Sequence, residues 1–433
     1  MRTKILGLVA IIIAIACGGT FSVPVAIVGC QNQFVTQMGS TSSNTTIKLS
    51  GWGSSSTEQK LLKQVLDEFE EKHPNIKVKY EVISDQYMDV LKTRLIGDAA
   101  PDVFYLDALE APFLMSQNVL ESLDSYISPE LEIKDFEENL LSSFVYKNRI
   151  YGFPKDYSTL ALFYNKKAFA NSGLNTPPDT WKQLRSYALE LTQDTDKDGR
   201  IDIYGFGETP ELARQGYKIR AFGGKITNHR GYATFANQAA LKGLQLVVDQ
   251  YRQDKSSAQK TDVGTNSGSE MFGQGKVAMV IEGNWAIPYL QETFPDLEFA
   301  TAPVPTINNK PGTMIFSVAY VMNKQSKHKD AAWELISYLT GKEGMEKWTS
   351  KGFALPTRRS VAEKLGYDKD SLRSALVAGV NYGMSWQVGK YPGVIVDHFN
   401  NQFTSTMLGE QPLKPAMRKA EASANKQIEA IEY

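Results

Sequence analysis

The spacing of apolar and polar residues changes repeatedly between two periods in the first part of the chain. Leu62, Val65 and Phe69 recur at helical spacing, whereas the segments on either side alternate apolar and polar side chains as strands do. We therefore expect strands at 46–50, 76–82 and 100–107, one helix that ends before His73-Pro74 and another helix at 85–96. Strands and helices in this alternation predict an α/β fold with a parallel sheet and helices on both faces.

A buried strand is also predicted much later in the chain. Val277 to Ile281 form a short apolar run with glycines on both sides, and Trp285 follows shortly after its end. Open α/β sheets bind ligands just outside the carboxyl ends of their strands, so this ring is a candidate stacking surface for a small molecule. The alternative is that the Trp285 ring only packs a helix against the sheet. Further strands are predicted at 203–206 and 315–322, and further helices at 330–339 and in the tail from 361 to 433.

Composition narrows the class of protein. A chain of 433 residues is expected to form two or three domains, and its 42% apolar and 22% charged residues are typical of a globular protein. A net charge of −1 gives no electrostatic footprint for nucleic acid. Both cysteines, Cys17 and Cys30, lie in the first thirty residues, so the body of the chain has neither a disulfide framework nor thiol chemistry.

The first 45 residues carry a targeting signal. Arg2 and Lys4 precede an apolar run, as in a secretory signal, and Ile27-Val-Gly-Cys30 resembles the bacterial lipobox, whose cysteine is acylated. We expect a lipoprotein signal peptide at 1–29 and a flexible tether rich in Ser, Thr, Asn and Gln at 30–45. The protein is then expected in the periplasm or at the cell surface, anchored to the membrane through lipidated Cys30. An uncleaved membrane-spanning anchor is the alternative.

A set of short motifs in fixed order carries a family resemblance. The motifs are Trp52-Gly53, Glu70 to Asn75, Ala100-Pro-Asp-Val103, Tyr151-Gly-Phe-Pro154, Leu162 to Lys166, Pro178-Asp-Thr-Trp181, Gly283-Asn-Trp285 and Ser326 to Trp333. Through them the chain, from about residue 46 to about residue 360, resembles the family 1 extracellular solute-binding proteins, the maltose-binding-like receptors of ABC importers.

This resemblance implies the periplasmic-binding-protein fold, in which two α/β lobes hold a ligand in the cleft between them. We expect the first lobe at 46–156 and 314–341, and the second lobe at 157–313 and 342–433. It also implies a monomer that binds a sugar-like ligand and docks on the permease and ATPase subunits of an importer. Contact with the membrane would be through the lipid anchor only.

Sugar recognition combines aromatic rings that cover C–H faces with polar groups that bond hydroxyls. By the resemblance, Trp285 stacks on a sugar ring, while Asp107 and Asp156 or Tyr157 bond ligand hydroxyls. Trp52 and Ser317 are further candidates because they stand at predicted strand ends, and the resemblance adds Glu58 and Arg358 with weaker support. Related receptors often carry Gly-Gly-Trp where this chain has Ile315-Phe316-Ser317, so Phe316 is expected to supply or reduce one stacking face, and the ligand's size is left open.

The strongest local motif predicts a calcium site. Asp194, Asp196, Asp198 and Asp202 stand at positions one, three, five and nine of a calcium-loop pattern, with glycine at position six. The backbone carbonyl of Arg200 would add a further oxygen ligand. Gly205 replaces the usual glutamate at position twelve, which should weaken a structural Ca²⁺ site. A polar turn without metal is the alternative.

Two other functional classes are compatible with these residues. A secreted glycoside hydrolase or lyase would use two carboxylates that face one bond, and Asp107 with Asp156 is the available pair. The sequence has no His-Glu-x-x-His motif, nucleophile elbow or phosphate loop. A structural surface lipoprotein would not need polar and aromatic residues at successive strand ends. We therefore favour a binding protein over an enzyme.

Overall fold

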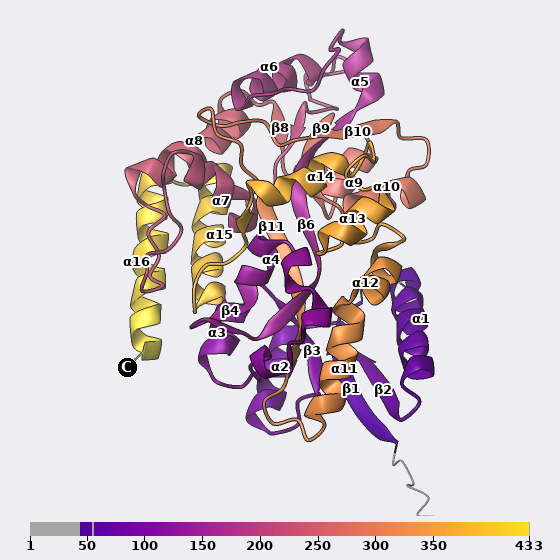
Figure 1. The fold of residues 1–433 in the computed structure, drawn as a ribbon. Helices are drawn as coiled ribbons and strands as arrows, with labels where there is room; N and C mark the ends of the chain where they lie inside the picture. The colour runs from indigo at the N-terminus through magenta and orange to yellow at the C-terminus, as the bar shows by residue number, and fades with distance from the viewer. Residues whose placement is uncertain (1–43, 54–55, 433) are drawn as a thin grey trace, which may run out of the picture. The chain divides into compact units, whose positions relative to one another are not determined.

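The computed structural model describes residues 44–53 and 56–432 (Figure 1). The predicted signal peptide, Cys30 and all but the last two residues of the tether lie outside the described residues. Within the described ranges, no helix is both long and apolar enough to cross a membrane.

The strands are short, except for two long ones near the middle of the sheet. Their bounds are β1 Thr45–Gly51, β2 Ile76–Val82, β3 Val103–Asp107, β4 Val145–Tyr146, β5 Arg149–Ile150, β6 Gly152–Asn165, β7 Phe206–Gly207, β8 Ser257–Ala258, β9 Met279–Gly283, β10 Phe299–Ala302, β11 Met314–Met322 and β12 Met384–Ser385.

Helices fill most connections between these strands. The α-helices are α1 Ser56–Lys72, α2 Tyr87–Ile96, α3 Ala111–Ser116, α4 Glu138–Leu141, α5 Lys166–Asn171, α6 Trp181–Leu191, α7 Leu212–Ala221, α8 Gln238–Arg252, α9 Gly268–Gly273, α10 Ala286–Thr293, α11 Lys329–Thr340, α12 Lys342–Thr349, α13 Arg359–Leu365, α14 Ser374–Ala378, α15 Pro392–Leu408 and α16 Leu413–Glu432. Short 3₁₀ turns lie at Asp124–Tyr126, Pro129–Leu131, Ile133–Asp135, Ser142–Phe144 and Gly379–Asn381.

The predicted α/β fold is confirmed, with strands ordered β2-β1-β3-β11-β6-β9-β7-β8 in one sheet. β1 pairs in parallel with β2 and β3, as the alternation of strands and helices predicted. β11 and β6 depart from that prediction, because β11 is antiparallel to both β3 and β6. The strand predicted at 203–206 is found only as the two-residue β7.

The long strand β6 belongs to two parts of the sheet. Its first half pairs with β11, and its second half, from Leu160, pairs with β9. The register of the β6–β11 pair shifts where Val318 faces Asp156 and Ala319 faces Pro154, so Lys155 is the extra residue of a β-bulge. Bulges re-aim side chains next to functional sites, and this one lies at the centre of the sheet.

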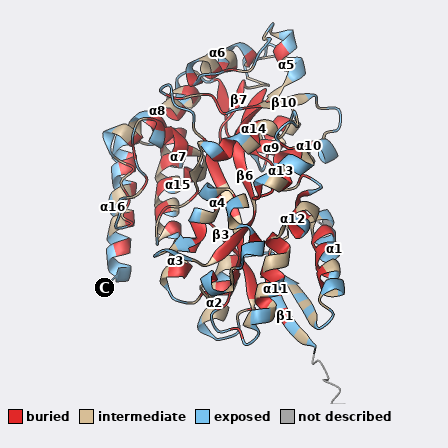
Figure 2. Cartoon of the chain, in the orientation of Figure 1, coloured by how far each residue is buried: buried red, intermediate tan, exposed pale blue. Residues whose placement is uncertain are grey.

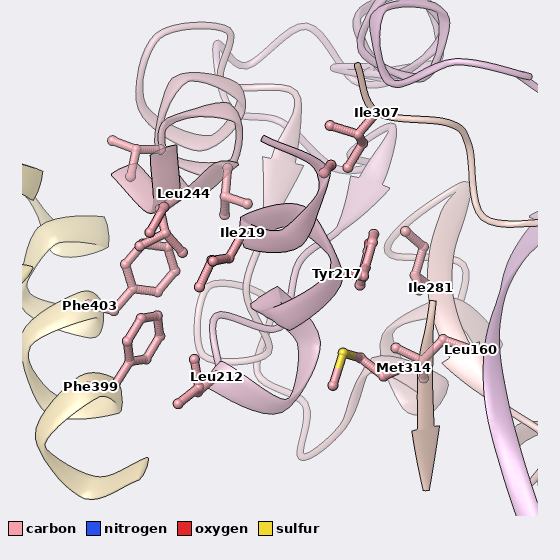
Figure 3. Packing of buried hydrophobic residues seen from close by; sticks show 14 of the residues in the cluster. Leu160, Leu212, Tyr217, Ile219, Leu244, Ile281, Ile307, Met314, Phe399 and Phe403 are labelled. Atoms are coloured by element: carbon pink, nitrogen blue, oxygen red, sulfur yellow. The ribbon is translucent and has the colours of Figure 1, made fainter. Parts of the chain in front are cut away.

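Among the described residues, buried side chains form three hydrophobic clusters, and the strands between the helices are mostly buried (Figure 2). One cluster lies around β1, β3 and α1. Another joins α6, α7 and α8 to the C-terminal helices, and Figure 3 shows Phe399 and Phe403 of α15 beside Leu244 and Ile219. These long-range contacts show that the helical tail packs into the globular body.

Part of the segment after α11 packs against β1 and β3. We assigned 342–433 to the second lobe, but Met345, Trp348 and Val361 pack into the same cluster as β1 and β3. α11 and α12 follow each other closely, and α12 contacts α1. The lobe boundaries stay a prediction, with α12 packed on the elements of the first lobe.

Candidate functional site

One pocket brings together most of the residues that the sequence singled out. It has a volume of about 350 Å³ and lies where β6, β11, α1 and α10 meet. Six predicted residues line it: Trp52, Glu58, Asp156, Tyr157, Trp285 and Phe316. Segments more than 200 residues apart in sequence therefore contribute to a single cavity. We refer to it as the central pocket.

Trp285 is the large aromatic side chain of this pocket that solvent reaches most freely. It is the N-cap residue of α10, directly after β9 and Asn284, and the residue is 40% exposed. The ring lies over Gly283, where an added Cβ would come within 2.3 Å of it. Phe316 of β11 meets the indole edge-on, with ring centroids 5.7 Å apart. An apolar surface of two rings is thus open to a ligand, and Phe316 takes part in it.

The β-bulge explains the polar side of the central pocket. In a regular strand, neighbouring side chains point to opposite faces, yet Lys155 and Asp156 both line the pocket. The Lys155 ammonium pairs with the Asp156 carboxylate and lies 4.1 Å from the ring centroid of Trp348. Trp348 Nε1 also donates to Asp156 Oδ2 at 2.9 Å. One Asp156 oxygen is therefore occupied, and the carboxylate is held in a fixed position.

The end of β1, together with α2 and β3, contributes an aromatic cluster beside the pocket. Trp52 meets Tyr87 and Tyr105 edge-on, with centroid distances of 5.0 and 5.3 Å. Tyr105 packs directly on Gly51, where a Cβ would lie 2.5 Å from its ring. Trp52 is thus fixed at the end of β1 by ring contacts, and part of it faces the pocket. The prediction for this residue rested on its position after a strand.

Two predicted strand-end residues lie outside the lining of the central pocket. The Asp107 carboxylate accepts a hydrogen bond from the Leu109 backbone N–H at 2.7 Å, and burial raises the pKa of Asp107 to about 6. The Ser317 hydroxyl is buried and donates to the Asp156 carbonyl oxygen at 3.1 Å. Both side chains form hydrogen bonds with backbone groups, so these two residues stabilise the backbone around the site.

Arg358 also lies away from the central pocket, and its partners are backbone carbonyls and one carboxylate. Its side chain is 1% exposed, and its guanidinium donates to the carbonyl oxygens of Thr340 at 2.6 Å and Leu131 at 2.8 Å. Nη1 lies 3.3 Å from an Asp135 carboxylate oxygen. Arg358 therefore joins α11 to the 131–135 turns, a structural role that sequence position alone did not indicate.

A second pocket of about 570 Å³ adjoins the first, since Trp285 and Tyr289 line both. Its other walls come from residues between 209 and 282 and include Thr209, Glu211 and Arg214. We call it the side pocket. A ligand larger than one ring has room to extend from the central pocket past Trp285 into the side pocket.

Some of these residues were missed by the sequence analysis. Tyr289 and Glu292 follow Trp285 at spacings of four and seven, the spacing of one helix face, so α10 could have indicated both. Lys155 could not be found in this way, because the bulge that turns it toward the pocket depends on the register with β11. Arg214 could not be found in this way either, because it lies on α7, which follows β7, whereas Trp285 follows β9.

The predicted calcium loop has a partial cluster of carboxylates. Asp194, Asp196 and Asp202 each offer an oxygen within 4.8 Å of the others. Asp198 is not in this group, and its carboxylate accepts from the Arg200 backbone N–H at 2.8 Å. Asp194 Oδ1 is shielded from solvent and has no hydrogen-bond partner. Three of the four predicted carboxylates therefore converge.

Known proteins resemble this chain over most of its length. The family described as bacterial extracellular solute-binding protein matches residues 53–346. A Brucella abortus (strain 2308) protein, provisionally described as a binding protein, is 26% identical over 375 residues, which cover 84% of this chain and 89% of that protein.

Two solved structures have the same fold. An ABC substrate-binding protein from Listeria monocytogenes, in complex with cycloalternan, has a TM-score of 0.79 at 22% identity and covers 89% of this chain and 99% of that one. An ABC transporter solute-binding protein from Thermotoga lettingae TMO, bound with α-D-tagatose, has a TM-score of 0.75 at 26% identity and covers 88% and 99%. With a family match over more than half of its residues, the chain belongs to the bacterial extracellular solute-binding proteins.

Proposed function

We propose that this protein is the extracytoplasmic receptor of an ABC importer and that it binds a sugar or sugar-derived solute reversibly by closure of two lobes. The observation that carries the proposal is the exposed Trp285 ring beside Phe316, in one pocket with the carboxylates of Glu58 and Asp156. Membership in the solute-binding family and the sugars bound by two structures of the same fold support it.

The chemistry of the central pocket suits a sugar better than a purely apolar ligand. A sugar ring has an apolar C–H face, which an indole covers, and hydroxyls around its rim, which carboxylates and an ammonium can bond. The central pocket offers both kinds of group within about 350 Å³. The side pocket beyond Trp285 favours a disaccharide, an oligosaccharide or a glycoside osmolyte as the ligand.

The alternative of a glycoside hydrolase or lyase has less support from the same residues. A hydrolase needs two carboxylates that face one bond. Asp107, the second carboxylate of the predicted pair, does not line the central pocket and bonds the Leu109 backbone N–H. Asp156 is engaged by Lys155 and Trp348. Of the predicted pair, Asp107 is thus used within the fold, and Asp156 faces the pocket with one oxygen already engaged.

A thermal-shift screen tests the proposed function. The panel contains D-tagatose, mannobiose, maltotriose, cycloalternan and glucosylglycerol, each at millimolar concentration. A sugar that binds only the native state raises the unfolding midpoint by mass action, and the midpoint rises further with sugar concentration. The same samples, analysed by chromatography after a long incubation, should return every sugar intact. If no sugar raises the midpoint, the assignment of a sugar ligand is wrong, and a cleaved sugar would favour the enzyme.

For the membrane, we propose that the mature protein is anchored through acylated Cys30. The lipobox-like Ile27-Val-Gly-Cys30 and the polar tether after it support this proposal. One acyl chain holds a protein only marginally, so several chains are expected on the mature N-terminus. Mass spectrometry of membrane-extracted protein should find acylated Cys30 as the first residue. The importer's permease and ATPase subunits are the proposed partners of the receptor.

For the loop at 194–202, we propose a structural Ca²⁺ ion. The convergence of the Asp194, Asp196 and Asp202 oxygens supports it, as does the solvent-shielded Asp194 Oδ1 without a hydrogen-bond partner. Calcium takes six to eight oxygen ligands, so water and the Arg200 carbonyl would have to complete the shell, and the affinity would be low. The ion would fix the loop before β7, outside both pockets, and act on stability more than on sugar binding.

A further inference from the structure

The indole of Trp285 is held by a buried carboxylate. Its Nε1–H donates to Glu282 Oε2 at 2.9 Å. Glu282 lies on β9 and is 2% exposed, while Trp285 at the start of α10 is 40% exposed. The indole N–H of an exposed ring is thus hydrogen-bonded to a carboxylate inside the protein.

Arg214 fixes that carboxylate in turn. Its Nη2 donates to the same Oε2 atom of Glu282 at 3.0 Å, and its Nη1 donates to the Ile281 carbonyl oxygen at 2.8 Å. The guanidinium carbon lies 5.4 Å from the centroid of the Trp285 ring. The cation compensates the buried negative charge, which would otherwise be costly, and joins α7 to β9.

Two glycines leave the space that this arrangement needs. A Cβ on Gly268 would lie 2.3 Å from Glu282 Oε1, and a Cβ on Gly283 would lie 2.3 Å from the Trp285 ring. Larger residues at either position would displace the carboxylate or the indole. The packing around both groups therefore allows Glu282 and Trp285 to approach each other as they do.

We propose that Glu282, held by Arg214, is a positioning residue that sets the orientation of Trp285 for stacking on a sugar. This inference rests on the proposed function. A free indole on the surface would lose rotamer freedom on binding, whereas an indole already fixed by a buried acceptor pays less of that cost. Glu282 and Arg214 also line the side pocket, so the experiment must separate action through Trp285 from direct contact with the sugar.

The first test needs no sugar and uses the indole N–H signals in ¹H–¹⁵N spectra. The chain has six tryptophans, and the signal of Trp285 is the one that Trp285→Phe removes. Glu282→Gln replaces a charged acceptor by a neutral one, so we expect the Trp285 signal to shift and its hydrogen exchange to accelerate about threefold or more. Glu298→Gln, a surface change in the same lobe, should leave it in place. An unchanged Trp285 signal in Glu282→Gln overturns the proposal.

The second test is a double-mutant cycle on affinity, measured with the sugar of the panel that raises the midpoint most. Glu282→Gln should weaken binding about threefold to tenfold in the wild-type background. In the Trp285→Phe background, which has no indole N–H, the same change should have at least about threefold less effect. Equal effects in both backgrounds would mean that Glu282 contacts the sugar or acts on the fold, and would overturn the proposal.

Unfolding midpoints of all variants check the fold. Trp285→Phe removes the hydrogen bond from the other side and leaves the pair of Glu282 and Arg214 intact, so it tests the bond even if Glu282→Gln folds poorly. A wild-type protein that binds no sugar of the panel would refute the proposed function, while the signal of Trp285 would still decide whether Glu282 positions the ring.

Discussion

Removal of the Trp285 ring is the most direct perturbation of the proposed binding site. A tryptophan side chain buries about 150–250 Å² when fully covered. Trp285 is 40% exposed, so a stacked sugar has roughly 60–100 Å² of it left to cover. At about 25 cal/mol per Å², this area contributes about 1.5–2.5 kcal/mol. Trp285→Ala should therefore weaken binding about tenfold to seventyfold.

Isothermal titration calorimetry with the sugar identified in the panel measures this loss. Trp285→Phe keeps a smaller ring and should fall between the wild type and Trp285→Ala. Leu408→Ala is the matched control, because Leu408 is an exposed apolar residue on α15 that lines neither pocket, and it should bind as the wild type does. The reasoning is refuted if Trp285→Ala binds the sugar with wild-type affinity while its unfolding midpoint is unchanged.

Two further predictions concern stability. Burial raises the pKa of Asp107 from 3.8 to about 6, so between these values the folded protein keeps a proton on Asp107 that the unfolded chain releases. The stability that the protonated Asp107 contributes is therefore complete below about pH 4 and is lost as the pH rises through 6. Asp107→Asn should thus gain up to about 3 kcal/mol over the wild type between pH 4 and pH 7 in urea unfolding; a difference that does not vary with pH contradicts this. Chelator should lower the unfolding midpoint of the wild type but not of Asp196→Ala, and equal midpoints with and without calcium in the wild type would show that the 194–202 loop is only a turn.

Local sequence patterns predicted the elements that short-range physics controls. β2 has the predicted bounds, since alternation depends on neighbours two residues away. β3 ends at Asp107 as predicted but begins at Val103, three residues later than the predicted Ala100. α1 ends at Lys72, directly before the His73-Pro74 stop signal. Trp285 could be predicted near the carboxyl end of a strand, because β9 ends two residues before it.

Register and long-range contacts decided the rest of the site. Lys155 faces the central pocket because β6 bulges against β11, a partner about 160 residues later in the chain. Arg358 has the residue type of a ligand contact, yet its guanidinium bonds backbone carbonyls of distant segments. Asp107 also has that residue type, but its carboxylate accepts from the nearby Leu109 backbone N–H within the fold.

The sequence by itself determined the fold class, the family and the presence of an aromatic residue where a ligand can bind. Only the tertiary structure decided which side chains accompany Trp285, since Arg214 and Phe316 reach it from two distant segments, while Glu282, three residues before it, is fixed in place by Arg214. The physical reason is that hydrophobic period and turn chemistry act over a few residues, whereas the charge and shape of a pocket arise where distant segments are brought together by packing.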